Sequence, residues 1–192
     1  MEKTILYLFV LSVSLEIIYL LLFILTIRLP GFRFWPPPGP RSWQFFTAWL
    51  MACFVAANFL ILSLLDFDSF ILPGLRVRLP IALVFLIFGG WLGSWSFLKF
   101  GLRTTIGLVQ KLITSGPYRF TRNPQYIGDS ANILGFMILT NSWMAWVMGI
   151  LGITLNTLAP FTEEPWLEEK FGEAYRNYKK EVPRFFNWRK ES

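Results

Sequence analysis

The sequence contains no histidine and a single cysteine, Cys53, in 192 residues. Catalytic triads that include histidine, imidazole metal sites and histidine proton shuttles are therefore excluded. One cysteine can form neither an internal disulfide nor a cysteine-based metal site. Any chemistry must therefore use carboxylates, tyrosines, arginines, backbone dipoles or a bound cofactor, and we expect no metal.

Charge is also scarce: 16% of the residues are charged, 54% are hydrophobic, and the mean hydropathy is +0.48. This composition is too apolar for an ordinary soluble domain and predicts a single membrane domain over residues 1–192. The formal net charge is +6. In a membrane protein this charge indicates orientation and contact with anionic lipid, so we expect no nucleic-acid partner.

Long apolar runs are abundant, and the first, residues 5–27, is long enough for a helix that crosses about 30 Å of hydrocarbon. The first is too long for a signal-peptide core and lacks a small-residue cleavage site, so we expect it to be retained. The sequence predicts an all-α, polytopic membrane protein with about five transmembrane helices and a cytoplasmic C-terminal helix that continues through about Tyr178. The expected spans are residues 5–27, 44–65, 79–98, 124–140 and 143–160.

Basic residues are concentrated in the loop 28–43, the segment 99–122 and the tail 162–192. The segment 99–122 contains no acid. Because positive loops stay in the cytoplasm, we expect these three regions to share the cytoplasmic side. The N-terminus and the loop with Asp66 and Asp68 are then outside. We divide the chain into a three-helix scaffold, 1–98, and a region that holds the motifs, 99–192.

We have specific expectations for several residues in the apolar runs and in the proline-rich loop. Glu16 lies near the middle of the first run, where an ionisable side chain is costly; it is either functional or a protonated or hydrogen-bonded lock between helices. Gly89, Gly90 and Gly93 predict close helix packing. Trp35 and Trp43, in and after a proline-rich loop, are typical of interfacial anchors.

Two possible helix starts carry polar residues. Asn123 before Pro124 has the pattern of an N-cap followed by proline at the first helical position. Thr162 is a second possible N-cap, which would place Glu163 and Glu164 in the first turn of a tail helix. Each pattern alone is typical of an ordinary cap. The hairpin 124–160 brings both to one interface, where helix-start N–H groups and arginine can bind a carboxylate and the glutamates can bind an ammonium or ribose hydroxyls.

The chain resembles the superfamily of isoprenylcysteine carboxyl methyltransferases and phospholipid methyltransferases over residues 99–186. The resemblance is carried by Leu-Ile-Thr-Ser-Gly-Pro-Tyr-Arg (112–119), Arg-Asn-Pro-Gln-Tyr-Ile-Gly (122–128), Glu-Glu-Pro (163–165), Phe-Gly-Glu-Ala-Tyr (171–175) and Val-Pro-Arg-Phe (182–185). The isoprenylcysteine enzymes usually have histidine at the position of Asn123. The Asn-Pro pair and the Glu-Glu-Pro triplet are more similar to the phospholipid amine methyltransferases.

This resemblance implies S-adenosylmethionine as methyl donor, bound at the cytoplasmic interface beneath a cleft that lipid can enter. The acceptor would be lipid-like, either a phospholipid amine or an isoprenylcysteine-type carboxylate. Carried over position by position, the cofactor-binding residues would be Leu112, Gly116, Tyr118, Arg122, Asn123, Tyr126, Glu163 and Glu164.

Methyl transfer from a sulfonium is an in-line displacement that needs alignment, exclusion of water and electrostatic complementarity. A carboxylate acceptor would need no base. An amine must be neutral when it attacks, and Glu164 and Asp129 are the candidates to accept its proton. Arg122 would either steer a phosphate or carboxylate or pair with acids of the tail.

Three alternatives remain open at this stage. One is a small transporter of lipophilic cations that uses Glu16 as its coupling carboxylate. Another is an NADPH-dependent enzyme, since Tyr126-Ile127-Gly128-Asp129 is also similar to membrane sterol reductases, which are longer chains with more spans. The third is a non-catalytic membrane interaction protein. The transporter leaves the motifs at 112–126 and 163–185 without a role.

Overall fold

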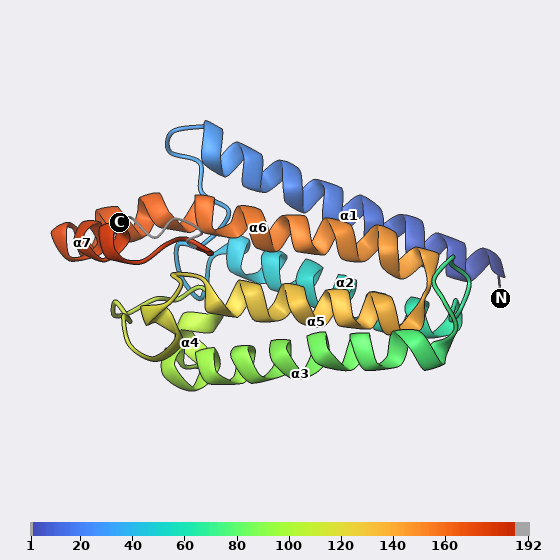
Figure 1. Cartoon of the computed structure of the whole chain (residues 1–192). Coiled ribbons are helices and arrows are strands. Elements are labelled where there is room, and N and C mark those ends of the chain that lie inside the picture. The colour runs from blue at the N-terminus through green and yellow to red at the C-terminus, as the bar shows by residue number, and fades with distance from the viewer. Residues whose placement is uncertain (1, 187–192) are drawn as a thin grey trace.

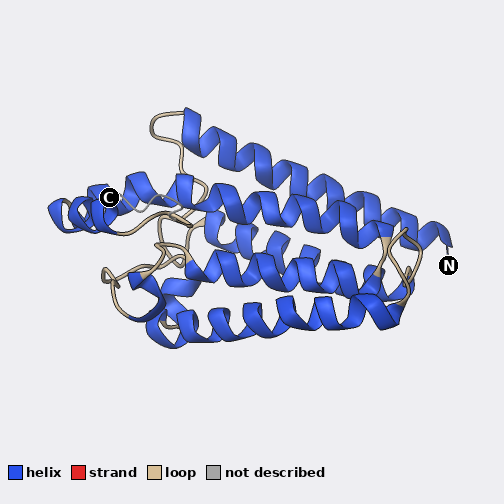
Figure 2. Cartoon of the chain, viewed as in Figure 1, coloured by secondary structure: helices blue, strands red, loops and turns tan. Residues whose placement is uncertain are grey.

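Long antiparallel helices make up the protein, shown here by a computed structural model that describes residues 2–186 (Figures 1 and 2). No strand occurs in this part of the chain, which confirms the all-α prediction. The elements are α1 (Glu2–Arg28), α2 (Trp43–Leu65), α3 (Leu75–Phe100), α4 (Leu102–Thr105), the 3₁₀ turn η1 (Gly116–Arg119), α5 (Pro124–Thr140), α6 (Trp143–Phe171) and α7 (Glu173–Glu181).

Four of these helices, α1, α2, α3 and α6, are long and apolar enough to cross a membrane. The remaining expected span coincides with α5, which has the predicted bounds and 17 residues. Its rise of about 25 Å is short for a crossing. The fifth crossing therefore stays a prediction for α5, which packs alongside α3 and α6.

The connections gather at two ends of the bundle. Figure 1 shows the loop between α1 and α2, α4 and α7 at one end, with the N-terminus at the other end beside the α5–α6 turn. We call the first the loop end. The three basic regions therefore share one end, as their charge predicted, and Asp66 and Asp68 lie at the opposite end. Which end faces the cytoplasm stays a prediction.

At the end opposite the loop end, Asp68 joins the α2–α3 loop to the α5–α6 turn. Its Oδ1 accepts hydrogen bonds from Asn141 Nδ2, at 2.8 Å, and from the buried Arg78. The hydrogen bond from Asn141, which has the larger effect, and the one from Arg78 hold the pKa of Asp68 below its ordinary value. Asn141 adopts the left-handed conformation, with φ 49°, which lets the chain reverse between α5 and α6.

Glycines bring α3 and α5 into backbone contact. A Cβ on Gly89 would lie 2.6 Å from the carbonyl oxygen of Gly128, and a Cβ on Gly128 would lie 2.9 Å from the amide nitrogen of Gly93. The predicted close packing is thus confirmed for Gly89, whereas at Gly93 the backbone is in contact with Gly128 but a Cβ on Gly93 itself would meet nothing within 4 Å. Gly90 faces away from α5, because a Cβ there would meet nothing within 4 Å.

The continuation of α6 overturns one expectation. We expected a new helix to start at Thr162, but α6 runs unbroken through Pro160 and Pro165. Thr162 is not an N-cap, and its hydroxyl instead donates to the carbonyl of Ala159 at 2.8 Å. Proline removes a helical hydrogen bond, but packed neighbours and threonine hydroxyls can satisfy the carbonyls it leaves. With 29 residues, α6 rises about 43 Å and extends beyond the other spans at the loop end.

We predict that Gly128→Ala lowers the stability of the bundle, because the added methyl would meet the backbone of α3, which cannot move aside locally. The expected cost is about 1–3 kcal/mol, the usual range for overpacking. Gly90→Ala is the matched control and should leave stability unchanged or slightly raised. Thermal unfolding in detergent measures both. Equal melting temperatures for the two variants would contradict the packing described here.

Candidate functional site

A cavity of about 590 Å³ lies within the bundle and receives side chains from α1, α2, α3, α5, α6, α7 and the segment between α3 and α5. Near the loop end its walls are polar, and we call this part the clamp end. Deeper in the bundle the walls are mostly apolar, and we call this part the inner section. The cavity therefore combines a polar region near the loop end with an inner part suited to hydrocarbon. Phe59, Leu60, Leu86, Phe136 and Met148 line the inner section.

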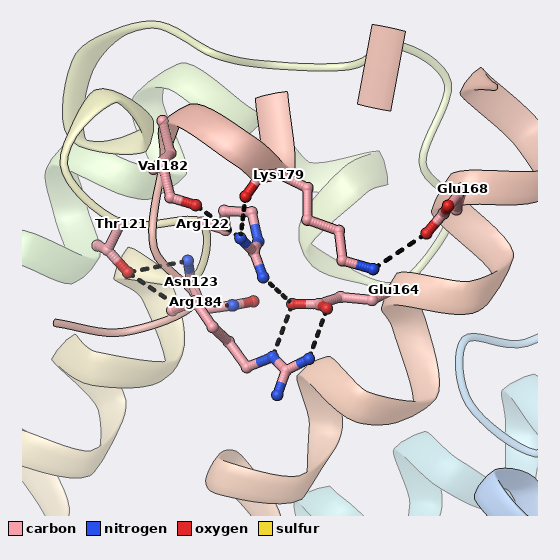
Figure 3. Close-up of polar contacts among 8 residues, drawn as sticks. All are labelled: Thr121, Arg122, Asn123, Glu164, Glu168, Lys179, Val182 and Arg184. Atoms are coloured by element: carbon pink, nitrogen blue, oxygen red, sulfur yellow. Dashed lines mark hydrogen bonds and ion pairs between the residues drawn. The ribbon is translucent and has the colours of Figure 1, made fainter. Parts of the chain in front are cut away.

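Glu164 is the centre of the clamp end (Figure 3). Its Oε1 pairs with Arg122 Nη2 at 2.8 Å, and its two oxygens accept from Arg184 Nε and Nη2 at 2.8 and 2.7 Å. Glu164 is 4% exposed, so these charges are held largely away from water. The hydrogen bond to Glu164 raises the pKa of Arg184. Arg184 also lies over the ring of Phe161, 3.8 Å from its centroid.

The segment after α7 is bound to the start of α5 by backbone as well as side-chain contacts. The amide of Arg122 donates to the carbonyl of Pro183 at 2.9 Å, and Arg122 Nη1 donates to the carbonyl of Val182 at 2.6 Å. Asn123 Nδ2 donates to the carbonyl of Arg184 at 3.0 Å. Residues about sixty positions apart in sequence thus form one unit.

The helix start at Asn123-Pro124 is confirmed, but the predicted cap is not. Asn123 occupies the N-cap position of α5 without a side-chain capping bond. Its amide points to the tail instead, because the carbonyl of Arg184 is within reach (Figure 3). An asparagine at this position therefore joins α5 to the tail rather than closing the helix end.

Beside the Glu164 ion pairs, Glu163 accepts hydrogen bonds from two uncharged side chains. Its Oε1 accepts from Tyr126 OH at 2.5 Å and from Trp35 Nε1 at 2.6 Å. Trp35 is 8% exposed and lies inside the protein, so its predicted role as an interfacial anchor is wrong, whereas Trp43 is 57% exposed. Hydrogen bonding to a buried carboxylate satisfies the indole N–H. Neighbouring glutamates on α6 thus face different partners.

Tyrosines form another wall of the clamp end. Tyr118 stacks on Phe100 with ring centroids 4.8 Å apart, and its carbonyl accepts from Tyr178 OH at 2.8 Å. The hydroxyl of Tyr118 is buried and has no hydrogen-bond partner among the described residues. Burial raises the pKa of Tyr118, so its phenol stays protonated and remains a donor. An unpartnered donor that faces a cavity is what a polar ligand would satisfy.

Most of the predicted site residues converge on this cavity. Gly116 does not line it; its φ of +65° and the position of its missing Cβ, 2.9 Å from Lys99 Cγ, indicate a role in the turn. The individual roles of the predicted site residues stay predictions. The residues that do line the cavity are Leu112, Tyr118, Arg122, Asn123, Tyr126, Asp129, Glu163 and Glu164.

Sequence reasoning missed Trp35, which lines the clamp end, and Arg184, which pairs with Glu164 without lining the cavity. Trp35 lies in a loop 91 residues before Tyr126, and nothing in the local pattern distinguishes it from a surface tryptophan. Arg184 belongs to the Val-Pro-Arg-Phe motif quoted for the family resemblance, so its position in a motif was a usable signal. The contact of Arg184 with Glu164 depends on how α7 folds back.

A comparison with family models matches residues 77–174 to the phospholipid methyltransferase family. The chain belongs to this family. The match starts inside α3, earlier than the expected 99, and it includes Arg122, Tyr126, Glu163 and Glu164. The transporter and interaction-protein alternatives leave this match unexplained.

The chain is also similar in sequence to two known methyltransferases. The chain is 26% identical to Protein-S-isoprenylcysteine O-methyltransferase of Schizosaccharomyces pombe, covering 88% of this chain and 78% of the relative. It is 30% identical to Phosphatidylethanolamine N-methyltransferase B of Dictyostelium discoideum, covering 60% of each chain. No solved structure matches. The comparisons thus place the protein among the membrane methyltransferases of lipid-type acceptors that its motifs resemble.

We predict that Glu164→Ala loosens the tail, because it leaves Arg122 and Arg184 without their acid. Removing one partner of a largely buried ion pair costs about 3 kcal/mol or more. Glu168→Ala is the matched control: Glu168, on the same helix as Glu164, pairs with Lys179 of α7 at 3.1 Å, but both side chains are about a third or more exposed. That loss should cost less than about 1 kcal/mol.

Hydrogen exchange of residues 173–186 measures this difference. Exchange should accelerate strongly in Glu164→Ala and remain close to wild type in Glu168→Ala. If the two variants exchange alike, the ion pairs of Glu164 do not hold the tail.

Proposed function

We propose that the protein transfers a methyl group from S-adenosylmethionine to a lipid-like acceptor. The observation that carries this proposal is the position of Glu163 and Glu164, inside the family match, at the polar end of a cavity whose inner section is apolar. Such a cavity suits one polar ligand and one ligand with a hydrocarbon part. The transporter, sterol-reductase and interaction-protein alternatives do not explain why residues 77–174 match the phospholipid methyltransferase family.

The donor groups at the clamp end suit S-adenosylmethionine. Its carboxylate would be matched by Arg122, and its ammonium or ribose hydroxyls by Glu163, which already accepts bonds from Tyr126 and Trp35. The unpartnered hydroxyl of Tyr118 adds a donor. When bound, S-adenosylmethionine supplies a methyl group activated by its sulfonium.

The chain's own residues would align the reactants and exclude water. Glu163, which is half-buried, and the aromatic side chains beside it form a partly anionic surface, which favours a positive sulfonium over water. Arg122 is held in place by Glu164 and by the tail carbonyls. No step of a methyl displacement needs histidine, which fits a chain that has none.

For an amine acceptor we assign the proton-accepting role to Asp129. Asp129 lines the cavity on α5, one turn after Tyr126. Glu164 was the other candidate, but both of its oxygens accept hydrogen bonds from arginine. A carboxylate that neutralises two guanidinium groups is a poor proton acceptor, so we propose that Glu164 positions Arg122.

The two relatives are named for different acceptors, isoprenylcysteine and phosphatidylethanolamine. Both acceptors combine a reactive polar group with hydrocarbon, which matches the two parts of the cavity. We further propose that the loop end faces the cytoplasm, where the basic loops are retained and the cofactor is available. This orientation places the N-terminus outside.

We predict that Glu163→Ala and Tyr126→Ala weaken S-adenosylmethionine binding by about tenfold or more, the order expected for loss of a hydrogen bond to a charged group. Glu168→Ala, which changes a half-buried acid on the same helix that does not line the cavity, should bind as wild type does. Isothermal calorimetry of the purified protein gives all three affinities. Absence of binding to wild type, or equal affinities in all variants, would refute the site assignment.

The acceptor is identified by incubating the protein with S-adenosylmethionine labelled in the methyl group and a total lipid extract. The labelled product should be a lipid and should be absent with Glu163→Ala. A label found only in water-soluble products would contradict a lipid-like acceptor.

A further inference from the structure

Glu16 is a buried acid in the cavity that the proposed reaction does not use. It lies near the middle of α1, is 2% exposed, and lines the cavity. Its Oε2 has no hydrogen-bond partner among the described residues. A carboxylate at this depth is costly unless a partner compensates it. An acid that serves only to lock helices together would be expected to use both oxygens on neighbouring helices.

Glu16 is well separated from the clamp end. Its Oε1 lies beside Gly152 of α6, 3.9 Å from where a Cβ would be. Glu163 follows Gly152 by eleven residues on the same helix, so about 16 Å of helix rise separates the two levels. Glu16 therefore belongs to the inner section, at a distance that one elongated ligand, or two ligands placed end to end, can cover.

The charges along the cavity are unevenly distributed. The basic residues that line it, Lys111 and Arg122, both precede α5 at the loop end, and Arg122 is paired with Glu164. Glu16 is the acid of the inner section, and among the described residues no lysine or arginine lines that section. The inner section is thus a mostly apolar space with one buried acid whose Oε2 has no hydrogen-bond partner among these residues.

We propose that Glu16 makes the inner section a binding subsite for a positively charged amine on a lipid-like ligand. An ammonium would compensate the carboxylate, and the aromatic rings of Phe59 and Phe136, which also line the cavity with centroids 5.7 Å apart, favour a cation. A ligand that ends in a carboxylate would be repelled. Only the identification of this ligand with the methyl acceptor rests on the proposed function.

Three photoreactive probes with the same hydrocarbon chain test the subsite: dodecylamine, dodecanoic acid and dodecanol, each with a diazirine at one carbon. The protein is placed in phosphatidylcholine nanodiscs, and labelling of α1 and α6 peptides is quantified by mass spectrometry. In wild type the amine probe should label these peptides about tenfold more than the acid probe, the size of effect typical of a close charge pair. Glu16→Gln should bring the ratio near one.

Matched variants make the result specific. Glu2→Gln, the same chemical change at an exposed position of α1, should keep the wild-type ratio. Glu16→Asp keeps the charge and should retain most of the preference. The alcohol probe should label wild type and Glu16→Gln equally. If it does not, Glu16→Gln has altered the cavity, and Glu16→Asp decides: loss of the amine preference there overturns the proposal.

The proposal is also overturned if amine and acid probes label wild type equally, or if Glu16→Gln keeps the wild-type ratio. Calorimetry with S-adenosylmethionine on the same samples separates the two proposals. Wild type that prefers the amine probe but binds no S-adenosylmethionine supports the subsite and refutes the methyl donor. The reverse result refutes the subsite alone.

Discussion

The arrangement of the clamp end depends on the ion pairs between Glu164 and two arginines. Glu164 belongs to α6, Arg122 to the residues just before α5, and Arg184 to the segment after α7. Burying one carboxylate is unfavourable, and the two guanidinium groups with their fixed hydrogen-bond geometry compensate it. Because each partner comes from a different segment, this buried charge can be satisfied in one arrangement of the three segments.

That arrangement requires α5 to be fixed along its length. At its start the tail carbonyls hold Arg122 and Asn123, and in the middle the backbone of α3 meets Gly128. At its far end Asn141 is bound to the α2–α3 loop through Asp68. Tyr126 and Asp129 lie between these attachments, so they reach the cavity from a helix that has little freedom to move. A site without histidine depends on such rigidity, since positioning has to supply what acid–base chemistry does not.

The sequence predicted the helices well and the contacts between distant segments less well. Apolar runs report burial in lipid directly, so the bounds of α5 were predicted to the residue and those of α2 within one. Thr162 and Asn123 were both read as caps because local pattern is all that a sequence shows there. In the structure their side-chain partners are Ala159 within α6 and Arg184 sixty-one residues away. Trp35 was misplaced for the same reason, since its hydrogen bond to Glu163 joins residues 128 positions apart.

The acids at the two ends of the cavity differ in how fully neighbouring groups pair with them. This difference bears on how a protein without histidine could bind the two ligands proposed above. At the clamp end, Glu164 is matched by arginine and Glu163 by neutral donors. In the inner section, Glu16 has an oxygen that no described residue hydrogen-bonds. A compensated carboxylate serves to hold other groups in place, whereas an uncompensated one in an apolar wall gains most when a cation arrives. The unequal compensation therefore distinguishes a preorganised region near the loop end from the inner section, where we propose that the amine of a ligand compensates Glu16.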